Sequence, residues 1–223
     1  MAKKNQPTAQ EEQVATTVSG LETFFKNNKN VIEWTILGII VVVCAFLAIN
    51  KWYVTPLKEE AQGQMFTAEQ KFRAADYQAA LEGDGNFLGF NDIAAQYGAK
   101  AGKAVYLYAG ICNLQLGNYE EAIKFLGKYS TSDKIMAARA LCCTGDAYAN
   151  LGENAKAVSF YKKAAAKDDS QYAAGYLLKA GIVSEEMGDS AAALKFYKEI
   201  ELNYPQSMEG YDIQKYISRI ENK

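Results

Sequence analysis

Side chains that commonly perform catalysis are scarce in this sequence. None of its 223 residues is a histidine, which removes serine–histidine and cysteine–histidine nucleophile pairs, HExxH zinc sites and every imidazole base. Adjacent carboxylates such as Glu120–Glu121 and Glu185–Glu186 diverge on a helix, so they do not form a general acid–base pair. We therefore expect no enzyme activity and no catalytic residues.

The cysteines do not supply a metal or redox site either. They form no CxxC motif, and no histidine is present to complete a zinc site. Three cysteines outside the apolar segment described below do not make a disulfide framework. We interpret all four as small buried hydrophobic residues: Cys44, Cys112, Cys142 and Cys143.

A glycine-rich stretch, residues 83–98, superficially resembles a nucleotide or calcium loop. Its glycines lack the GxGxxG spacing, and the neighbouring residues 98–104 are one residue short of a phosphate loop. Its acceptor side chains are too few for a calcium loop. We interpret it as a turn between helical units, followed by a short extra helix from about Leu88 to Tyr97, and expect no cofactor.

The charge balance argues against nucleic acid as a partner. The chain has 24 Lys and Arg residues and 26 Asp and Glu residues, which gives a net charge of -2. There is therefore no basic surplus to neutralise phosphates. Hydrophobic residues make up 49% of the chain, enough for a sizeable core. The length fits one domain and an additional segment.

That additional segment is apolar and lies near the start. Residues 34–49 carry no charge; they begin with Trp34, and Trp52 and Tyr53 follow them. Residues 31–53 reach the roughly 20 residues that a membrane-spanning helix needs. We predict a polar tail at 1–30, a transmembrane helix at 31–53 and a folded domain at 54–223. A buried core helix is the alternative.

Flanking lysines predict the orientation of this helix. Lys3, Lys4, Lys26 and Lys29 precede its uncharged stretch, residues 34–49, whereas Lys51 and Lys58 follow that stretch. The positive-inside rule then places the amino terminus in the cytoplasm and residues 54–223 outside it, in the periplasm of a Gram-negative cell. No small-residue cleavage site follows residue 49, so we expect the helix to remain as an anchor.

The remaining sequence is repetitive. Three columns of small residues recur at spacings of 35 and 36: Gly110, Gly145 and Gly181; Gly117, Gly152 and Gly188; and Ala122, Ala157 and Ala193. Each unit predicts a helix, a turn and a second helix. The middle column suits the left-handed residue that ends a helix, and the other two mark the closest approach of paired helices. Bulky side chains at Leu126, Tyr161 and Tyr197 should fill the next gap.

This spacing, the small-residue columns and Pro205 resemble tetratricopeptide repeats over about residues 104–205. A degenerate unit precedes them at 61–81, with Ala75-Asp76-Tyr77 at its turn. After Pro205 we expect a capping helix, with Tyr211, Gln214, Ile217 and Ser218 along one face and Ile213, Tyr216 and Ile220 beside them. The predicted fold is all-α: one transmembrane helix, then an α-solenoid of one degenerate repeat, three clear repeats and the cap.

The resemblance implies that the first helix of each unit lines a concave face. The implied lining residues are Met65, Phe66, Phe72, Leu107, Tyr108, Ile111, Leu114, Arg139, Cys142, Cys143, Asp146, Leu178, Lys179, Ile182 and Glu185. Most are apolar, so they either pack against neighbouring segments or form a groove for an apolar or extended segment of another protein. The clamp for terminal carboxylates known in this family needs Asn and Lys where this chain has Leu107, Ile111, Cys143 and Gly175, so we do not expect that clamp.

The layout of tail, anchor and repeats, with ALEGDGNFLGF and AVYLYAGICNLQLGNYEEAI, is similar to YfgM-like membrane-anchored repeat proteins, particularly those of Bacteroidetes. This resemblance implies an inner-membrane protein with a periplasmic repeat domain. It also implies an ancillary role at the Sec translocon, with translocon subunits, periplasmic chaperones or exported clients as partners. The alternative is a structural subunit of an envelope complex for secretion or division, its groove filled internally.

Overall fold

The computed structural model describes residues 27–168 and 170–222, which form helices joined by short turns. Within these residues no β-strand forms, and the only β-type pairing is an isolated bridge between Gly83 and Leu88. The chain divides into two compact units, Met1–Pro56 and Leu57–Lys223. Most of the predicted polar tail, residues 1–26, lies outside the described part of the chain.

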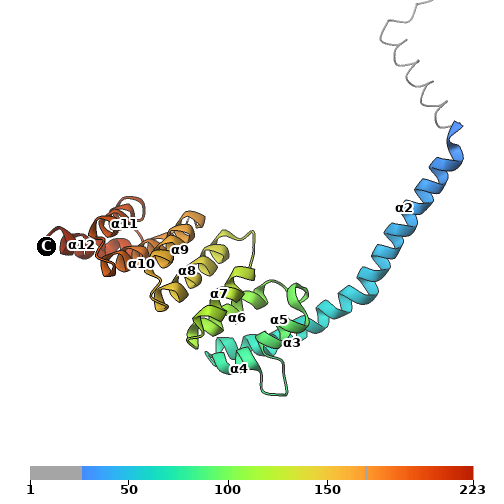
Figure 1. Ribbon diagram of the computed structural model, residues 1–223, viewed down its shortest axis with the longest axis horizontal. Helices are drawn as coiled ribbons and strands as arrows, with labels where there is room; N and C mark the ends of the chain where they lie inside the picture. The colour runs from blue at the N-terminus through green and yellow to red at the C-terminus, as the bar shows by residue number, and fades with distance from the viewer. Residues whose placement is uncertain (1–26, 169, 223) are drawn as a thin grey trace, which may run out of the picture. The chain divides into compact units, whose positions relative to one another are not determined.

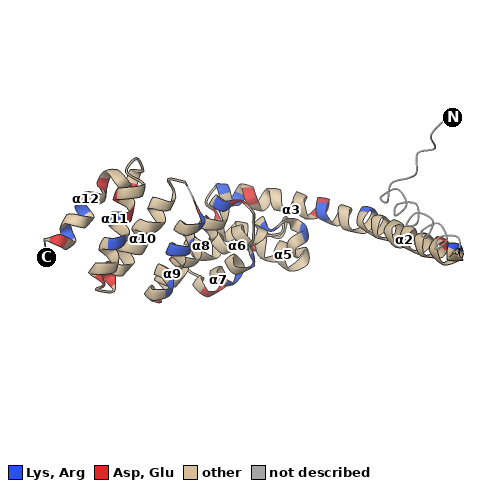
Figure 2. Cartoon of the chain, turned by 90° about the horizontal axis from the view of Figure 1, so that it is seen from above, with Lys and Arg blue, Asp and Glu red and all other residues tan. Residues whose placement is uncertain are grey.

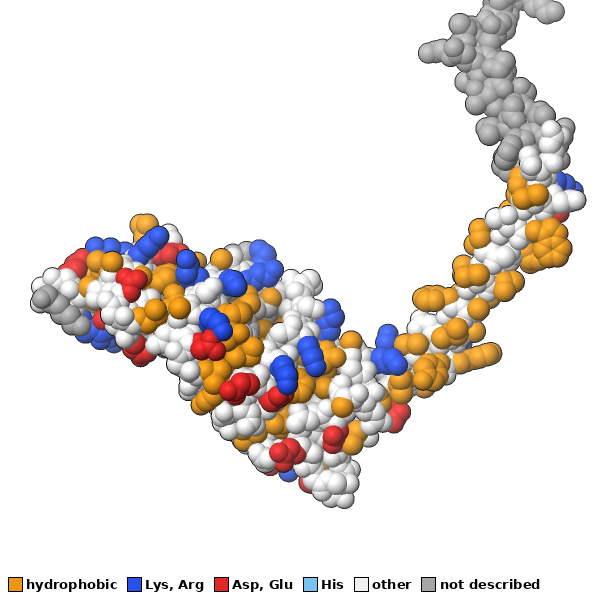
Figure 3. Space-filling view, in the orientation of Figure 1, with side chains coloured by type: hydrophobic (Ala, Val, Ile, Leu, Met, Phe, Trp, Pro, Cys, Tyr) orange, Lys and Arg blue, Asp and Glu red, His pale blue; other side chains and the backbone are white. Residues whose placement is uncertain are grey.

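The described part of the first unit is an apolar helix. Helix α2 spans Lys29–Ile49 and is followed by a π-helix at Asn50–Val54. Its 21 residues rise about 30 Å, the thickness of a bilayer core, and none of them is buried. Charged side chains lie only near its ends (Figure 2), and hydrophobic side chains are spread along the face seen in Figure 3. By length and composition this helix could cross a membrane.

The second unit is a stack of helix pairs. Figure 1 shows helices α6 to α11 as three antiparallel pairs stacked in chain order, which confirms the predicted α-solenoid. A 3₁₀ turn at Gly98–Ala101 precedes α6. The helices are α3 (Thr55–Arg73), α4 (Tyr77–Glu82), α5 (Phe90–Gln96), α6 (Ala104–Gln115), α7 (Tyr119–Lys128), α8 (Lys134–Asn150), α9 (Asn154–Lys167), α10 (Ala173–Glu186), α11 (Ser190–Asn203) and α12 (Met208–Glu221).

The turn inside each pair is made by a left-handed residue, as predicted. Gly117, Gly152 and Gly188 have φ angles of +81°, +75° and +80°. After each of them, the next backbone N–H donates to a carbonyl five residues earlier, as Asn118 does to Asn113 at 2.8 Å, which satisfies an otherwise unpaired helix carbonyl. In the degenerate unit Ala75 takes this conformation with φ +58°, and Asp76 caps α4.

The two helices of each pair approach most closely at the glycines of the first helix. A Cβ atom added to Gly110 would lie 2.6 Å from Leu126 Cγ, and one added to Gly145 would lie 2.6 Å from Tyr161 Cε1. Gly181 lies against Tyr197 in the same way. Ala122, Ala157 and Ala193 are fully buried on the second helices. The predicted roles of these columns are therefore confirmed.

The glycine-rich segment, residues 83–98, adds a short helix between α4 and α6. We predicted a helix from about Leu88 to Tyr97, and α5 occupies Phe90–Gln96. The fully buried Phe90 ring stacks on Tyr108 with 5.2 Å between ring centroids and meets Phe72 edge-on at 6.4 Å. The insertion thereby fills the space between α3 and α6.

Helix α12 packs against the last pair, as expected of the predicted capping helix. Tyr211 is 73% exposed, and Gln214 and Ser218 are also exposed. The buried residues are Ile213 and Ile217, which lie four residues apart and so share one stripe of the helix. Of the residues predicted along one face, Ile217 is buried. Tyr216 and Ile220, predicted beside that face together with Ile213, are partly buried against the same cluster.

We expect Gly145→Ala to lower the free energy of unfolding by about 1–3 kcal/mol, because the new methyl group overpacks the buried Tyr161 ring. Gly63→Ala is the matched control: it lies within α3 with no atom within 4 Å of the added Cβ. This control should be neutral or stabilising by up to about 1 kcal/mol. Urea denaturation followed by circular dichroism measures both, and equal stabilities of the two variants would contradict the close-approach role.

Candidate functional site: a groove across the first helices

A groove with a volume of about 940 Å³ crosses the first helices of the repeats. Helices α6, α8 and α10 line it, and the start of α12 closes one end. The structure brings these predicted residues together there: Ile111, Leu114, Arg139, Cys142, Cys143, Asp146, Leu178, Lys179 and Ile182. Its volume lies within the range of about 300–1,000 Å³ typical of binding sites.

The other predicted lining residues lie elsewhere. Met65 and Leu107 are buried in the core, at 5% and 2% exposure. Phe72 and Tyr108 contact each other edge-on at 4.9 Å in the ring cluster around Phe90. Phe66 is exposed, and Glu185 is bonded to Tyr197 and Arg219. The insertion accounts for Phe72 and Tyr108, because Phe90 packs against both of these rings.

Sequence reasoning missed ten lining residues. They are Gln115, Ile135, Met136, Gln171, Tyr172, Gly175, Tyr176, Ser207, Met208 and Glu209. Many extend the groove along the same first helices, one turn before the predicted positions. Ser207, Met208 and Glu209 belong to the start of α12, whose side-chain cap is Ser207. The i, i+3 and i+4 spacing from predicted residues could have identified the additional residues on α8 and α10.

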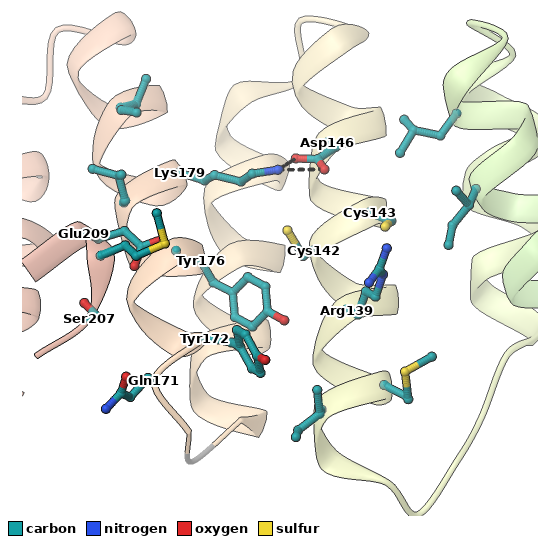
Figure 4. A pocket seen from close by; sticks show the side chains of 18 of the residues that line it. Arg139, Cys142, Cys143, Asp146, Gln171, Tyr172, Tyr176, Lys179, Ser207 and Glu209 are labelled. Carbon is teal, nitrogen blue, oxygen red and sulfur yellow. Dashed lines mark hydrogen bonds and ion pairs between the residues drawn. The ribbon is translucent and has the colours of Figure 1, made fainter. Parts of the chain in front are cut away.

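The charged groups across the groove are paired between successive first helices. Lys179 Nζ of α10 lies 2.7 and 2.8 Å from the two carboxylate oxygens of Asp146 on α8 (Figure 4). Asp146 also accepts a hydrogen bond from the Tyr161 hydroxyl at 2.8 Å. The same arrangement recurs between α10 and α12. Glu185 of α10 accepts a hydrogen bond from the Tyr197 hydroxyl at 2.8 Å and forms an ion pair with Arg219 of α12.

These pairs set the electrostatics of the groove. Burial by itself would lower the pKa of Lys179, but neighbouring Cys142 and the hydrogen bonds and charge of Asp146 outweigh it, so the pKa is raised. Lys179 is therefore charged at neutral pH and already paired with Asp146. This fits the expectation that the groove does not clamp a partner's terminal carboxylate.

The cysteines of the groove are protonated thiols. Burial first, and then the Asp146 charge, raise the pKa of Cys142 to about 12 and that of Cys143 to about 11. A thiol with a raised pKa is a poor nucleophile at neutral pH. Cys112 and Cys142 are buried as predicted, whereas Cys143 is half-buried and Cys44 is exposed. The prediction for Cys143 was wrong because this residue borders the groove, whereas Cys44 lies on the apolar helix α2.

No metal site forms in the part of the chain that the structure describes. Within residues 27–168 and 170–222 there is no cluster of three or more Cys, Asp and Glu side chains that could hold an ion. The groove therefore offers apolar surface, two tyrosines and a few charges. Such a combination of apolar surface and a few polar groups is typical of binding pockets.

The comparisons with known proteins agree with this geometry. Tetratricopeptide repeat models match residues 104–132 and 176–207, and a second such model matches residues 138–166. The chain contains tetratricopeptide repeats. The three matches coincide with the helix pairs α6–α7, α8–α9 and α10–α11, so the three clear repeats predicted from the glycine columns are confirmed.

The tetratricopeptide stack is also similar to solved structures. Two crystal structures of MamA superpose on it with TM-scores of 0.54 and 0.57, each at 19% sequence identity. The alignments cover 70% and 74% of this chain and 84% of each MamA chain. At this identity the likeness concerns the fold. No curated protein matches the sequence.

We expect Cys143 to react slowly with iodoacetamide near neutral pH. With a pKa of about 11, only about one Cys143 in a thousand is a thiolate at pH 8, so alkylation should be about a hundred-fold slower than at an ordinary exposed cysteine. Because the pKa is raised, the rate should climb about tenfold per pH unit up to about pH 11. Cysteine placed at the exposed Lys163 of α9 (Lys163→Cys) is the control, and equal rates at pH 8 would contradict the assignment.

Proposed function

We propose that this protein is a membrane-anchored scaffold that binds other proteins through the groove and catalyses no reaction. The observation that carries the proposal is the composition of the groove. Its apolar side chains come from successive first helices, its central charges are paired within the repeats, and its thiols are protonated. Tetratricopeptide repeats serve in general as surfaces for protein binding, which supports the same conclusion.

The anchor in this proposal is the apolar helix of the first unit. The exposed hydrophobic surface of α2, the tryptophans at 34 and 52, and the excess of lysines before the span support a single pass of residues 31–53 with the amino terminus in the cytoplasm. Residues 54–223 then form a repeat domain on the periplasmic side of a bacterial inner membrane. The predicted domain division rests on the same argument.

The partner in this proposal is an exported protein or part of its export machinery. The support is the resemblance of the layout to YfgM-like proteins, which implies an ancillary role at the Sec translocon and contact with periplasmic chaperones or exported clients. The alternative, a structural subunit of an envelope complex, requires the groove to be filled by the protein itself. Exposed apolar side chains at the groove, such as Tyr172 at 65%, favour a partner from outside the chain.

Photo-crosslinking in intact membranes tests the binding role. A benzoylphenylalanine residue at position 172, within the groove, should crosslink to partner proteins that mass spectrometry identifies. The same residue at position 163, exposed on the second helix α9 and outside the groove lining, is the control and should give few crosslinks. Crosslinks from α2 positions with none from position 172 would contradict the groove and favour the structural subunit.

Protease accessibility tests the orientation. Protease added to spheroplasts should digest the repeat domain, because it lies outside the cytoplasmic membrane, while a cytoplasmic marker protein stays intact. After lysis both should be digested. Complete protection of the repeat domain in intact spheroplasts would contradict a periplasmic location.

A further inference from the structure

Exposed apolar side chains gather around the groove. Ile135 of α8, Tyr172 just before α10 and Met208 of α12 are 42%, 65% and 86% exposed, and all three line the groove. They come from three successive first-helix positions along the stack. A partner that lay along the groove would cover all three, which is the favourable apolar burial that drives most protein association.

Two charges of the groove lack partners, in contrast to the Asp146–Lys179 pair. Within the described residues, Arg139 of α8 and Glu209 of α12 form no ion pair and no side-chain hydrogen bond, although both line the groove. Arg139 is exposed, and Glu209 is half-buried against Gly175 of α10. In the view of Figure 4, Tyr172 and Tyr176 lie between them. The groove thus presents a cation at one place, a carboxylate at another, and apolar surface between.

The separation of these charges indicates the size of a matching segment. Neighbouring packed helices lie about 10 Å apart, so α8 and α12, with α10 between them, place the two charges about 20 Å apart. An extended chain covers that distance in about six residues. A helical segment would need about thirteen residues to cover the same distance. An extended segment therefore reaches both charges with about half as many residues.

We infer that the groove binds an extended, mostly apolar peptide segment that carries an acidic side chain opposite Arg139 and, about six residues away, a basic side chain opposite Glu209. The inference rests on the proposed function, since it specifies the chemistry of the partner for the same groove. The apolar residues of the segment supply buried area, and the two charges determine its orientation along the stack.

A peptide library tests this pairing on the full chain in lipid nanodiscs. The probes are acetylated, amidated peptides with an apolar Leu/Val/Phe centre and Glu, Lys or Gln at two positions three to nine residues apart, in both orders. Fluorescence anisotropy should show tightest binding for one Glu and one Lys about six residues apart. Peptides with Gln at both positions should bind more weakly.

Charge-reversal variants identify which protein side chain contacts each charge of the peptide. Arg139→Glu should weaken the Glu/Lys peptide at least about tenfold, because it places like charges together, and a peptide with Lys at both positions should recover the loss. Glu209→Lys should likewise weaken the Glu/Lys peptide and be rescued by a peptide with Glu at both positions. Lys163→Glu, on α9 and outside the groove lining, changes the net charge by the same amount as Arg139→Glu and should leave every affinity unchanged.

The possible failures are distinct. Binding of apolar peptides with no charge preference and no effect of Arg139→Glu would overturn this inference and leave the proposed function standing. Failure of every peptide to bind would overturn both. A wild-type oligomer that Arg139→Glu dissociates, measured by light scattering while no peptide binds, would show that a second copy of the chain occupies the groove and would also overturn the inference.

Discussion

The repeat stack depends on one contact, in which a bulky side chain of each second helix lies against a glycine of the first. At Gly145 this contact brings the Tyr161 ring so close that no Cβ atom would fit. The same tyrosine then reaches Asp146, which in turn holds Lys179 of the next repeat. The close packing of each helix pair thereby also positions the charged side chains of the groove. The Gly181–Tyr197 contact leads in the same way to Glu185 and Arg219.

This arrangement is suited to binding another protein. The central carboxylate and amine of the groove neutralise each other, and burial keeps the neighbouring thiols protonated. What remains available to a partner is apolar surface on successive first helices, together with Arg139 and Glu209. Apolar burial can supply affinity in such a groove, while a small number of charges can supply orientation and selectivity.

The sequence alone predicted much of the fold because its determinants are local and repeated. The glycines at 117, 152 and 188 mark turns that need a positive φ, and the period of 35 and 36 residues fixes where the helices pair. The groove was harder to predict where the repeat is irregular. Phe90 lies in an insertion outside the period, so its stacking on Tyr108 could not be read from the repeat register. Met208 and Glu209 lie beyond the last repeat, where extrapolation of that register ends.

Hydrogen–deuterium exchange of the full chain, alone and bound to a partner recovered by crosslinking, tests the central claim most directly. Binding in the groove should slow exchange in the first helices α8 and α10 and at the start of α12. Exchange in the second helices α7, α9 and α11 should be unchanged, because they do not line the groove. Protection confined to those second helices, or no protection in α8 and α10, would contradict the account.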